Sequence, residues 1–299
     1  MAVLGLAGPA GVAAAAFGGS AAAVAPTVST VAANAGPVLY HQPLLGKDVL
    51  SLPFGLSRTA DVQSSNWAGY ADIDDTYETA SVSWIQPSVN CSSNTGGGGG
   101  LSSLLGGLLG GGASGTEYSS FWVGLDGYTS SSVEQAGTDS DCDGTTPTYY
   151  AWYEMYPAGS TDISTTSYPV APGDQLNAMV MSNAAGTSFD LMLSDGAISS
   201  PKWTFSITLS GSGLSRSSAE FVAEAPSSCT LIFCNELPLA NFGSVTFTNA
   251  HAADTAGVSG NIDAFSNAAM TMASGGSTKA TPTPSANPGP TFSVTWDNS

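Results

Sequence analysis

The chain has 299 residues, with 5 Lys and Arg against 23 Asp and Glu, and its formal net charge is −18 at pH 7. So few cations exclude a protein that neutralises a nucleic-acid backbone, and an anionic membrane would repel it. The 6 Trp, 10 Tyr and 11 Phe exclude an acidic disordered tail, because these side chains need a core. Two interpretations of the charge stay open: tolerance of acid, where few positive charges would repel one another, or an exported protein of ordinary acidic pI.

The first 35 residues predict a secretory leader. No charged residue precedes Lys47, Met1–Ala25 resembles the apolar core of a signal, and Ala33-Asn34-Ala35 is an A-x-A cleavage site. A transmembrane anchor is the alternative, but Gly and Pro interrupt the apolar run and no basic flank follows it. We therefore expect a signal peptide over residues 1–35, a secreted product, and a short linker or pro-segment over residues 36–62.

Short alternating runs separated by turn residues begin after residue 60. In the clearest run, Trp203 to Ser210, apolar and hydroxyl side chains alternate, so one strand face is buried and the other is wet. No stretch after residue 60 has helical periodicity with caps. The pattern predicts an all-β domain over residues 63–299, built as an antiparallel sandwich or barrel. Similar runs lie at residues 176–181, 189–193, 245–248 and 292–296.

One segment, residues 95–115, breaks the strand pattern. It holds two runs of glycine around a Leu-Leu-Gly-Gly-Leu-Leu sequence, and glycine at this density does not form a regular strand. We expect an insertion between a strand ending near Val89 and one starting near Tyr118. A tolerated surface loop is favoured over a mobile flap.

Four cysteines, an even number, suggest two disulfides in an exported chain. Cys229 and Cys234 close a short loop, which leaves Cys91 to pair with Cys142. A zinc site is not expected, because the chain has only two histidines and no C-x-x-C motif.

Strand-borne carboxylates and amides are the remaining candidates for chemistry. The sequence has no H-E-x-x-H, no Asp-Thr-Gly or Asp-Ser-Gly pair and no phosphate-binding loop, and a serine triad would have to use His251 without a nucleophile elbow. From the residues alone, a strand Glu is most often a solvated outer residue, and a Gln such as Gln135 is most often structural. Two strands nevertheless place Glu among apolar or aromatic neighbours on one face, which should raise its pKa: Tyr150, Trp152, Glu154 and Tyr156 on one, and Glu220, Val222 and Glu224 on the other.

An ordered set of short motifs resembles the glutamic peptidases of the eqolisin family. Each motif is weak by itself, but all of them occur in the family's order over roughly residues 63–299. The motifs are Ser65-Asn66-Trp67-Ala68-Gly69, Trp122-Val123-Gly124-Leu125-Asp126-Gly127, Gln135-x-Gly137, Trp152-Tyr153-Glu154-x-Tyr156-Pro157 and Ala219-Glu220-Phe221-x-x-Glu224, followed by Leu239–Phe242 and Phe292–Trp296.

This resemblance implies a fold and a site. The family fold is a lectin-like jelly roll of two packed antiparallel sheets, and the family dyad maps onto Gln135 and Glu224. It implies protein or peptide substrates, with no metal or cofactor; we also expect a monomer that binds neither nucleic acid nor membrane. Positions that line or support the family's cleft correspond to Trp122, Asp126, Asp139, Glu154 and Tyr156.

The leading hypothesis is a secreted acid endopeptidase. In it, Glu224 activates a water as general base and then serves as acid, and Gln135 stabilises the oxyanion. One alternative is a sandwich-fold glycoside hydrolase that uses Glu154 and Glu224 as its two carboxylates. The other is a non-catalytic carbohydrate-binding module that uses the aromatic stripe of Tyr150, Trp152 and Tyr156.

Overall fold

The computed structural model describes residues 38–51, 59–91, 115–230, 233–284 and 288–298 of the chain. Residues 36–299 form one compact unit. The predicted signal peptide lies outside the described residues. The predicted glycine-rich insertion at residues 95–115 also lies outside them, apart from Gly115. No helix in the described ranges is long and apolar enough to cross a bilayer.

The first large sheet joins strands that are far apart in the sequence. All its pairs are antiparallel except β3 with β19, which run parallel. The short strand β6 (Thr116–Glu117) also pairs with β8. The strands pair in the order β2 (Asp48–Ser51), β3 (Thr59–Ser64), β19 (Ser266–Ser274), β4 (Trp67–Ile73), β14 (Ser218–Glu224), β7 (Ser120–Leu125), β8 (Val133–Asp143), β9 (Thr146–Tyr156) and β10 (Thr161–Asp162).

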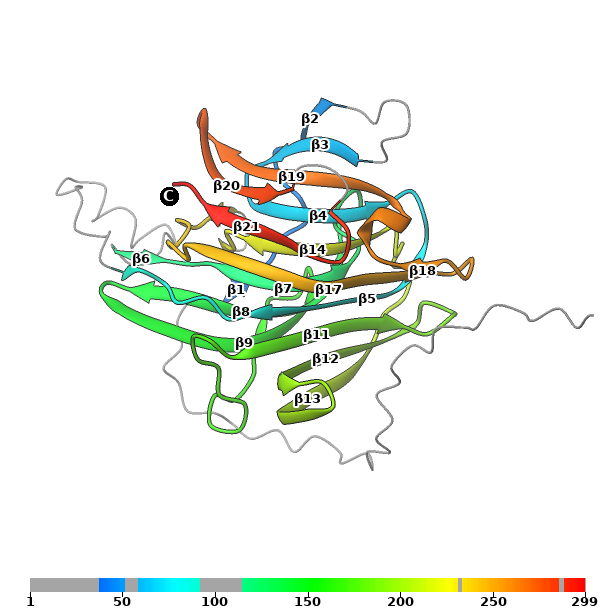
Figure 1. Cartoon of the computed structure of the whole chain (residues 1–299), viewed down its shortest axis with the longest axis horizontal. Helices are drawn as coiled ribbons and strands as arrows, with labels where there is room; N and C mark the ends of the chain where they lie inside the picture. The colour runs from blue at the N-terminus through cyan, green and yellow to red at the C-terminus, as the bar shows by residue number, and fades with distance from the viewer. Residues whose placement is uncertain (1–37, 52–58, 92–114, 231–232, 285–287, 299) are drawn as a thin grey trace, which may run out of the picture. The chain divides into compact units, whose positions relative to one another are not determined.

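The second large sheet is antiparallel throughout its described pairs (Figure 1). Its strand β20 also pairs with β19, which links the two sheets. The short strand β18 (Ser259–Gly260) pairs with β17, and the 3-10 helix η2 (Ile262–Ala264) leads on to β19. The order is β13 (Ser200–Ser210), β12 (Ser188–Ala197), β11 (Gln175–Ser182), β5 (Tyr77–Ile85), β17 (Ser244–Asp254), β21 (Phe292–Trp296) and β20 (Ser277–Thr283).

A third, small sheet brings the beginning of the described chain onto the domain. In it β1 (Leu39–Tyr40) pairs with β15 (Ser227–Cys229), which pairs with β16 (Cys234–Glu236). The Cys229–Cys234 disulfide closes the β15–β16 hairpin. The second predicted disulfide, Cys91–Cys142, is also present, so both pairings are confirmed.

The first sheet buries both of its faces. Alternate residues of β7 and β14, such as Phe121 and Phe221, belong to the core that also contains Leu176 and Leu191 of the second sheet. The residues between them in sequence point the other way, because side chains alternate along a strand. They form a second cluster, the tryptophan cluster, made of Trp67, Trp122, Trp152, Val222 and their apolar neighbours.

The predicted all-β sandwich is confirmed, and the predicted runs fall on β11, β12, β13, β17 and β21. Along β13 the side chains alternate between half-buried and exposed, as its amphipathic pattern requires. The strand expected to end near Val89 ends at Ile85 instead, because Pro87 follows and cannot donate to a ladder. The predicted boundary at residues 62/63 falls inside β3.

Candidate active site

The register of four neighbouring strands sets the site on the tryptophan-cluster face. Gln135 on β8 lies opposite Glu154 on β9 and opposite Gly124 on β7. Ser120 on β7 lies between Asp139 on β8 and Glu224 on β14. Partners in adjacent strands project to the same face, so these polar groups gather on one side of the sheet.

Gln135 is fully buried, and its amide nitrogen has two acceptors. It donates to the backbone carbonyl of His41 at 2.7 Å and to Glu154 Oε2 at 3.3 Å. Its own oxygen has no partner among the described residues. Gly124 lies beside it, where an added Cβ would come within 3.2 Å of the Gln135 Cβ. The amide is therefore fixed, with an N–H directed at a peptide carbonyl.

Glu224 is buried and holds two hydrogen-bond donors. Trp122 Nε1 donates to its Oε2 at 2.8 Å, and Asn66 Nδ2 donates to its Oε1 at 3.3 Å. Burial raises the pKa of Glu224 well above its usual range, while the charge of His41 and the two donors act in the opposite direction. A carboxyl group with a raised pKa and fixed donors can both take and return a proton.

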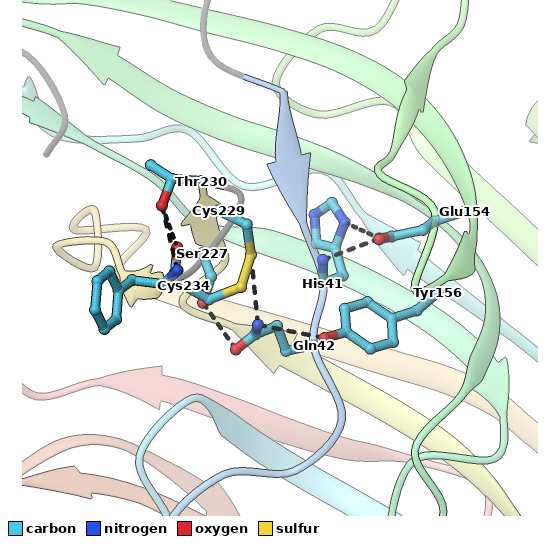
Figure 2. The surroundings of a disulfide bond; sticks show 9 residues. His41, Gln42, Glu154, Tyr156, Ser227, Cys229, Thr230 and Cys234 are labelled. Atoms are coloured by element: carbon cyan, nitrogen blue, oxygen red, sulfur yellow. Dashed lines mark hydrogen bonds and ion pairs between the residues drawn. A yellow bond between two sulfur atoms is a disulfide. The ribbon is translucent and has the colours of Figure 1, made fainter. Parts of the chain in front are cut away.

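His41 is fully buried and lies against Glu154, as Figure 2 shows. Its Nδ1 and its backbone N–H both contact Glu154 Oε2, at 2.8 and 2.9 Å. Its Nε2 lies 3.1 Å from Ser120 Oγ and 3.9 Å from Asp139 Oδ1. The ring stacks on Trp152 with 3.5 Å between centroids and 4° between planes.

These contacts determine the charge of His41. Burial alone would lower its pKa, but the interactions with Asp139 and Glu154 outweigh burial and raise the pKa to about 10. The ring is therefore an imidazolium at neutral pH. Burial likewise raises the pKa of Glu154, and the bonds from His41 oppose that rise.

Residues 39–45, named here the cleft segment, begin with the two-residue strand β1 and carry His41 across the site. Its amino end pairs with β15, and Ser160 N–H donates to the Leu39 carbonyl. Its carboxyl end is held by Asn66, whose side chain accepts from Leu45 N–H at 2.9 Å and donates to the carbonyls of Gln42 and Pro43. Asn66 thus joins the cleft segment to Glu224.

Gln42 connects the cleft segment to the disulfide hairpin. Its amide nitrogen lies 3.5 Å from the hydroxyl of Tyr156 and 3.5 Å from Cys229 Sγ, and its oxygen accepts from Ser227 at 3.5 Å (Figure 2). Tyr156, predicted to line the cleft, thus contacts the segment that fills it.

Hydrogen bonds among side chains of β8 and β9 hold Asp139 in place beside His41. Asp139 accepts from Trp152 Nε1 at 2.7 Å and from the Tyr150 hydroxyl at 2.9 Å. The same hydroxyl also reaches Asp141 Oδ2 at 2.8 Å. Burial raises the pKa of Asp141, and the charge of Asp139 adds to the rise. Asp139 is therefore shared by these side chains and by His41.

Two acidic residues singled out from the sequence lie elsewhere. Asp126 accepts from the backbone N–H groups of Arg216 and Ser217 at 2.6 and 2.9 Å, and so holds the loop that enters β14. Glu220 is buried and, within the described part of the chain, forms no hydrogen bond or ion pair with His41. Burial raises its pKa well above the usual range. Of the two Glu residues on β14, Glu224 is the one in contact with the site.

His41, Asn66 and Ser120 are site residues that sequence reasoning did not select. Asn66 stood within a recognised motif, and that position was the available signal. His41 stood in a segment predicted to be a linker or pro-segment, and its partners Ser120 and Glu154 are 79 and 113 residues away. A single histidine in such a segment gives no local pattern.

Comparison with known proteins decides the family. The sequence model of the Peptidase A4 family matches residues 65–296. The chain belongs to the Peptidase A4 family. Aspergillopepsin-2 from Aspergillus niger is 32% identical over 222 residues, which span 73% of this chain and 73% of that protein. Scytalidopepsin B from Scytalidium lignicola is 32% identical over 189 residues, 62% of each chain.

Solved structures of similar proteins agree. A scytalido-glutamic peptidase bound to a peptide-based transition-state analogue superposes with a TM-score of 0.59 at 26% identity, covering 78% of this chain and 98% of its own. Aspergilloglutamic peptidase from Aspergillus niger gives 0.50 at 27% identity, with 60% and 99% covered. The resemblance to the eqolisin family is confirmed. This A4-family member is an acid endopeptidase that hydrolyses peptide bonds of proteins or peptides, and neither carbohydrate-directed alternative is favoured.

Proposed function

We propose that Gln135 and Glu224 form the catalytic dyad of this endopeptidase. The observation that supports this most directly is the 2.7 Å hydrogen bond from Gln135 Nε2 to a backbone carbonyl, that of His41. An oxyanion donor must lie where a peptide carbonyl can reach it, and here one does. Glu224 lies on the same sheet face, and Asn66 bonds both Glu224 and the residues that follow that carbonyl.

The chemistry follows from the two side chains. Burial, the main cause of the raised pKa of Glu224, ends when the cleft segment leaves and water reaches the carboxyl group. Ionised Glu224 then takes a proton from a water molecule while the oxygen of that water attacks the peptide carbonyl carbon. The N–H of Gln135 stabilises the negative charge that develops on the carbonyl oxygen. Protonated Glu224 then gives the proton to the leaving nitrogen, the C–N bond breaks, and the carboxylate is restored. Trp122 and Asn66 hold Glu224 in position through both transfers.

The described arrangement is a closed form. Gln135, Glu154 and Glu224 have at most 1% exposure under the cleft segment, so a substrate cannot reach them until the segment moves. In this proposal the cleft segment is the part of the predicted linker or pro-segment, residues 36–62, that keeps the site closed. The strands β2 and β3, which follow it, belong to the first large sheet. The cleft segment lies ahead of residues 65–296, which match the family.

We further propose a secreted monomer that acts on proteins and binds neither nucleic acid nor membrane. Two disulfides suit an oxidising compartment. A net charge of −18 with five cations disfavours phosphate-rich partners.

The test of the dyad compares wild-type protein with Gln135→Ala and Glu224→Gln. Each is incubated with a denatured protein at about pH 3.5 and pH 7, with pepstatin added to suppress aspartic peptidases. We expect proteolysis at acid pH in the wild type and a loss of about 100- to 1000-fold in Gln135→Ala. Circular dichroism should show both variants folded. A folded Gln135→Ala protein with wild-type activity would sink the assignment.

A further inference from the structure

The cleft segment lies in the site as a peptide substrate would. The Gln135 amide, which the proposed function makes the oxyanion donor, bonds the carbonyl of His41. The carbonyls of Gln42 and Pro43, the next two residues, are held by Asn66. His41 therefore occupies the position of the substrate residue on the acyl side of the bond to be cleaved. The contacts of its side chain indicate which side chains that subsite binds.

Four residues surround the His41 side chain and are named here the His41 pocket: Ser120, Asp139, Trp152 and Glu154. Trp152 forms a flat floor, since its ring lies parallel to the imidazole at 3.5 Å. The Nδ1 atom of the ring lies 2.8 Å from Glu154 Oε2, and the Nε2 atom lies 3.1 Å from Ser120 Oγ. The pocket thus fits a thin planar ring with a polar atom on each of two edges.

The walls are built independently of His41. Asp139 is fixed by Trp152 and Tyr150, and Glu154 lies opposite Gln135 in the strand register. All four pocket residues are almost completely buried. An aliphatic side chain in the pocket could not replace the contacts that the imidazole makes with Glu154 and Asp139. A site built to hydrogen-bond a polar group discriminates strongly against a substrate that lacks that group.

We propose, on the basis of the proposed function, that the His41 pocket is the subsite for the acyl-side residue and that it selects histidine over aliphatic residues. The cleft segment closes the enzyme because it presents such a histidine. Glu154 and Ser120 are then the specificity-determining residues, reading the two ring nitrogens.

The first experiment measures this preference on peptides that copy residues 38–46, with His, Gln or Leu at the position of His41. Full-length enzyme is incubated at acid pH, and kcat/KM and the cleaved bond are determined by mass spectrometry. We expect the His peptide to be cleaved after His and to exceed the Leu peptide at least tenfold. Glu154→Gln and Ser120→Ala should each reduce that ratio, whatever they do to the overall rate. The matched control, Glu78→Gln on β5, should keep it.

A binding measurement separates this proposal from the dyad. In the full-length His41→Ala/Glu224→Gln protein, the cleft segment lacks its histidine and the dyad is disabled. The His peptide should bind this protein at least tenfold more tightly than the Leu peptide. Glu224-dependent proteolysis without a His preference would overturn the pocket and leave the dyad standing. Preferential binding of His without any proteolysis by wild type would support the pocket and overturn the dyad. Equal binding and equal cleavage of the two peptides would overturn the pocket.

Discussion

Trp122 is the residue that links the core to the chemistry. Its ring packs edge-on against Trp67 with centroids 5.0 Å apart, and its N–H fixes Glu224. Gly137 makes this possible, because a Cβ there would come within 2.5 Å of the Trp122 Cβ. The position of Glu224, the proposed general base, is therefore set by packing as well as by hydrogen bonding.

Replacing this indole should shift the pH profile. In Trp122→Phe, Glu224 loses a donor that lowers its pKa, so that pKa should rise further. A general base must be ionised, and the acid limb of kcat/KM should therefore move to higher pH. The profile of activity against pH measures this. The control is Trp203→Phe on β13 of the second sheet, which removes an indole N–H that donates to the carbonyl of Pro169. It should leave the acid limb of the profile in place. An unshifted limb in a folded Trp122→Phe protein would argue against Glu224 as the base.

At the scale of elements, the cleft segment acts through β1 and its neighbours. Leu39 and Tyr40 pair with β15, and His41 follows at once, so the hairpin sets the depth at which the imidazole sits. The Cys229–Cys234 disulfide in turn fixes the hairpin. A strand added to a short sheet therefore positions the side chain that closes the site.

Loss of His41 should open the enzyme earlier. In His41→Ala the imidazolium no longer bonds Glu154 or approaches Asp139, so the cleft segment loses its strongest charged contact. Full-length wild type should show a lag before it cleaves a denatured protein at about pH 5, and His41→Ala should show a shorter one. His251→Ala is the matched control, since His251 contacts Ser259 and lies partly exposed on β17. An identical lag in the two histidine variants would contradict the role given to the segment.

The two disulfides should differ in their effect on stability. Cys91 and Cys142 are 51 residues apart, whereas Cys229 and Cys234 are 5 apart. A longer closed loop constrains the unfolded chain more, so replacing the first pair by Ser should cost about 4 kcal/mol and the second about 2 kcal/mol. Urea unfolding of the two double variants under non-reducing conditions measures both. Equal losses would show that loop length does not dominate here.

Across the whole molecule, buried carboxyl groups with raised pKa values contribute to how stability depends on pH. Asp72, Glu134 and Glu220 are buried, and none of the three forms a salt bridge among the described residues. Burial raises the pKa of all three, and the nearby charge of Asp126 helps to raise that of Glu134 to about 9. The folded state therefore holds protons that the unfolded state releases.

The free energy of unfolding should accordingly fall as pH rises from about 4.5 to about 9. A raised folded pKa contributes stability below the unfolded pKa, and that contribution is lost as pH approaches the folded value. Each such proton changes the free energy by about 1.4 kcal/mol per pH unit. Thermal unfolding at pH 4, 6 and 8 measures the slope. Glu134→Gln, which stays neutral, should flatten it, and Glu78→Gln should not. A wild-type protein that is more stable at pH 8 than at pH 4 would refute this account.

The sequence supported the sandwich because alternation is local: the run from Trp203 to Ser210 can be read without knowing its neighbours. The sequence also predicted Glu154 and Glu224 as site residues, because both lie within motifs that occur in the family's order. It could not supply His41, whose contacts depend on which strand its segment joins. Strand alternation alone does not separate Glu220 from Glu224, because both lie on one face of the strand. The family motif selects Glu224, and the contacts of Glu224 with Trp122 and Asn66 become visible only in the structure.

The side chain of Asn66 has a consequence for the order of events. Its amide nitrogen carries two hydrogens but faces three oxygens, each at 3.3 Å: those of Gln42, Pro43 and Glu224. At least one of the two hydrogens is therefore shared between two acceptors, which weakens the bond that Asn66 gives to Glu224. Withdrawal of residues 39–45 leaves Glu224 as the remaining acceptor of the three. If the cleft segment leaves as proposed, the same movement therefore uncovers Glu224 and gives it the full hydrogen bond of the Asn66 amide, which stabilises the ionised carboxylate.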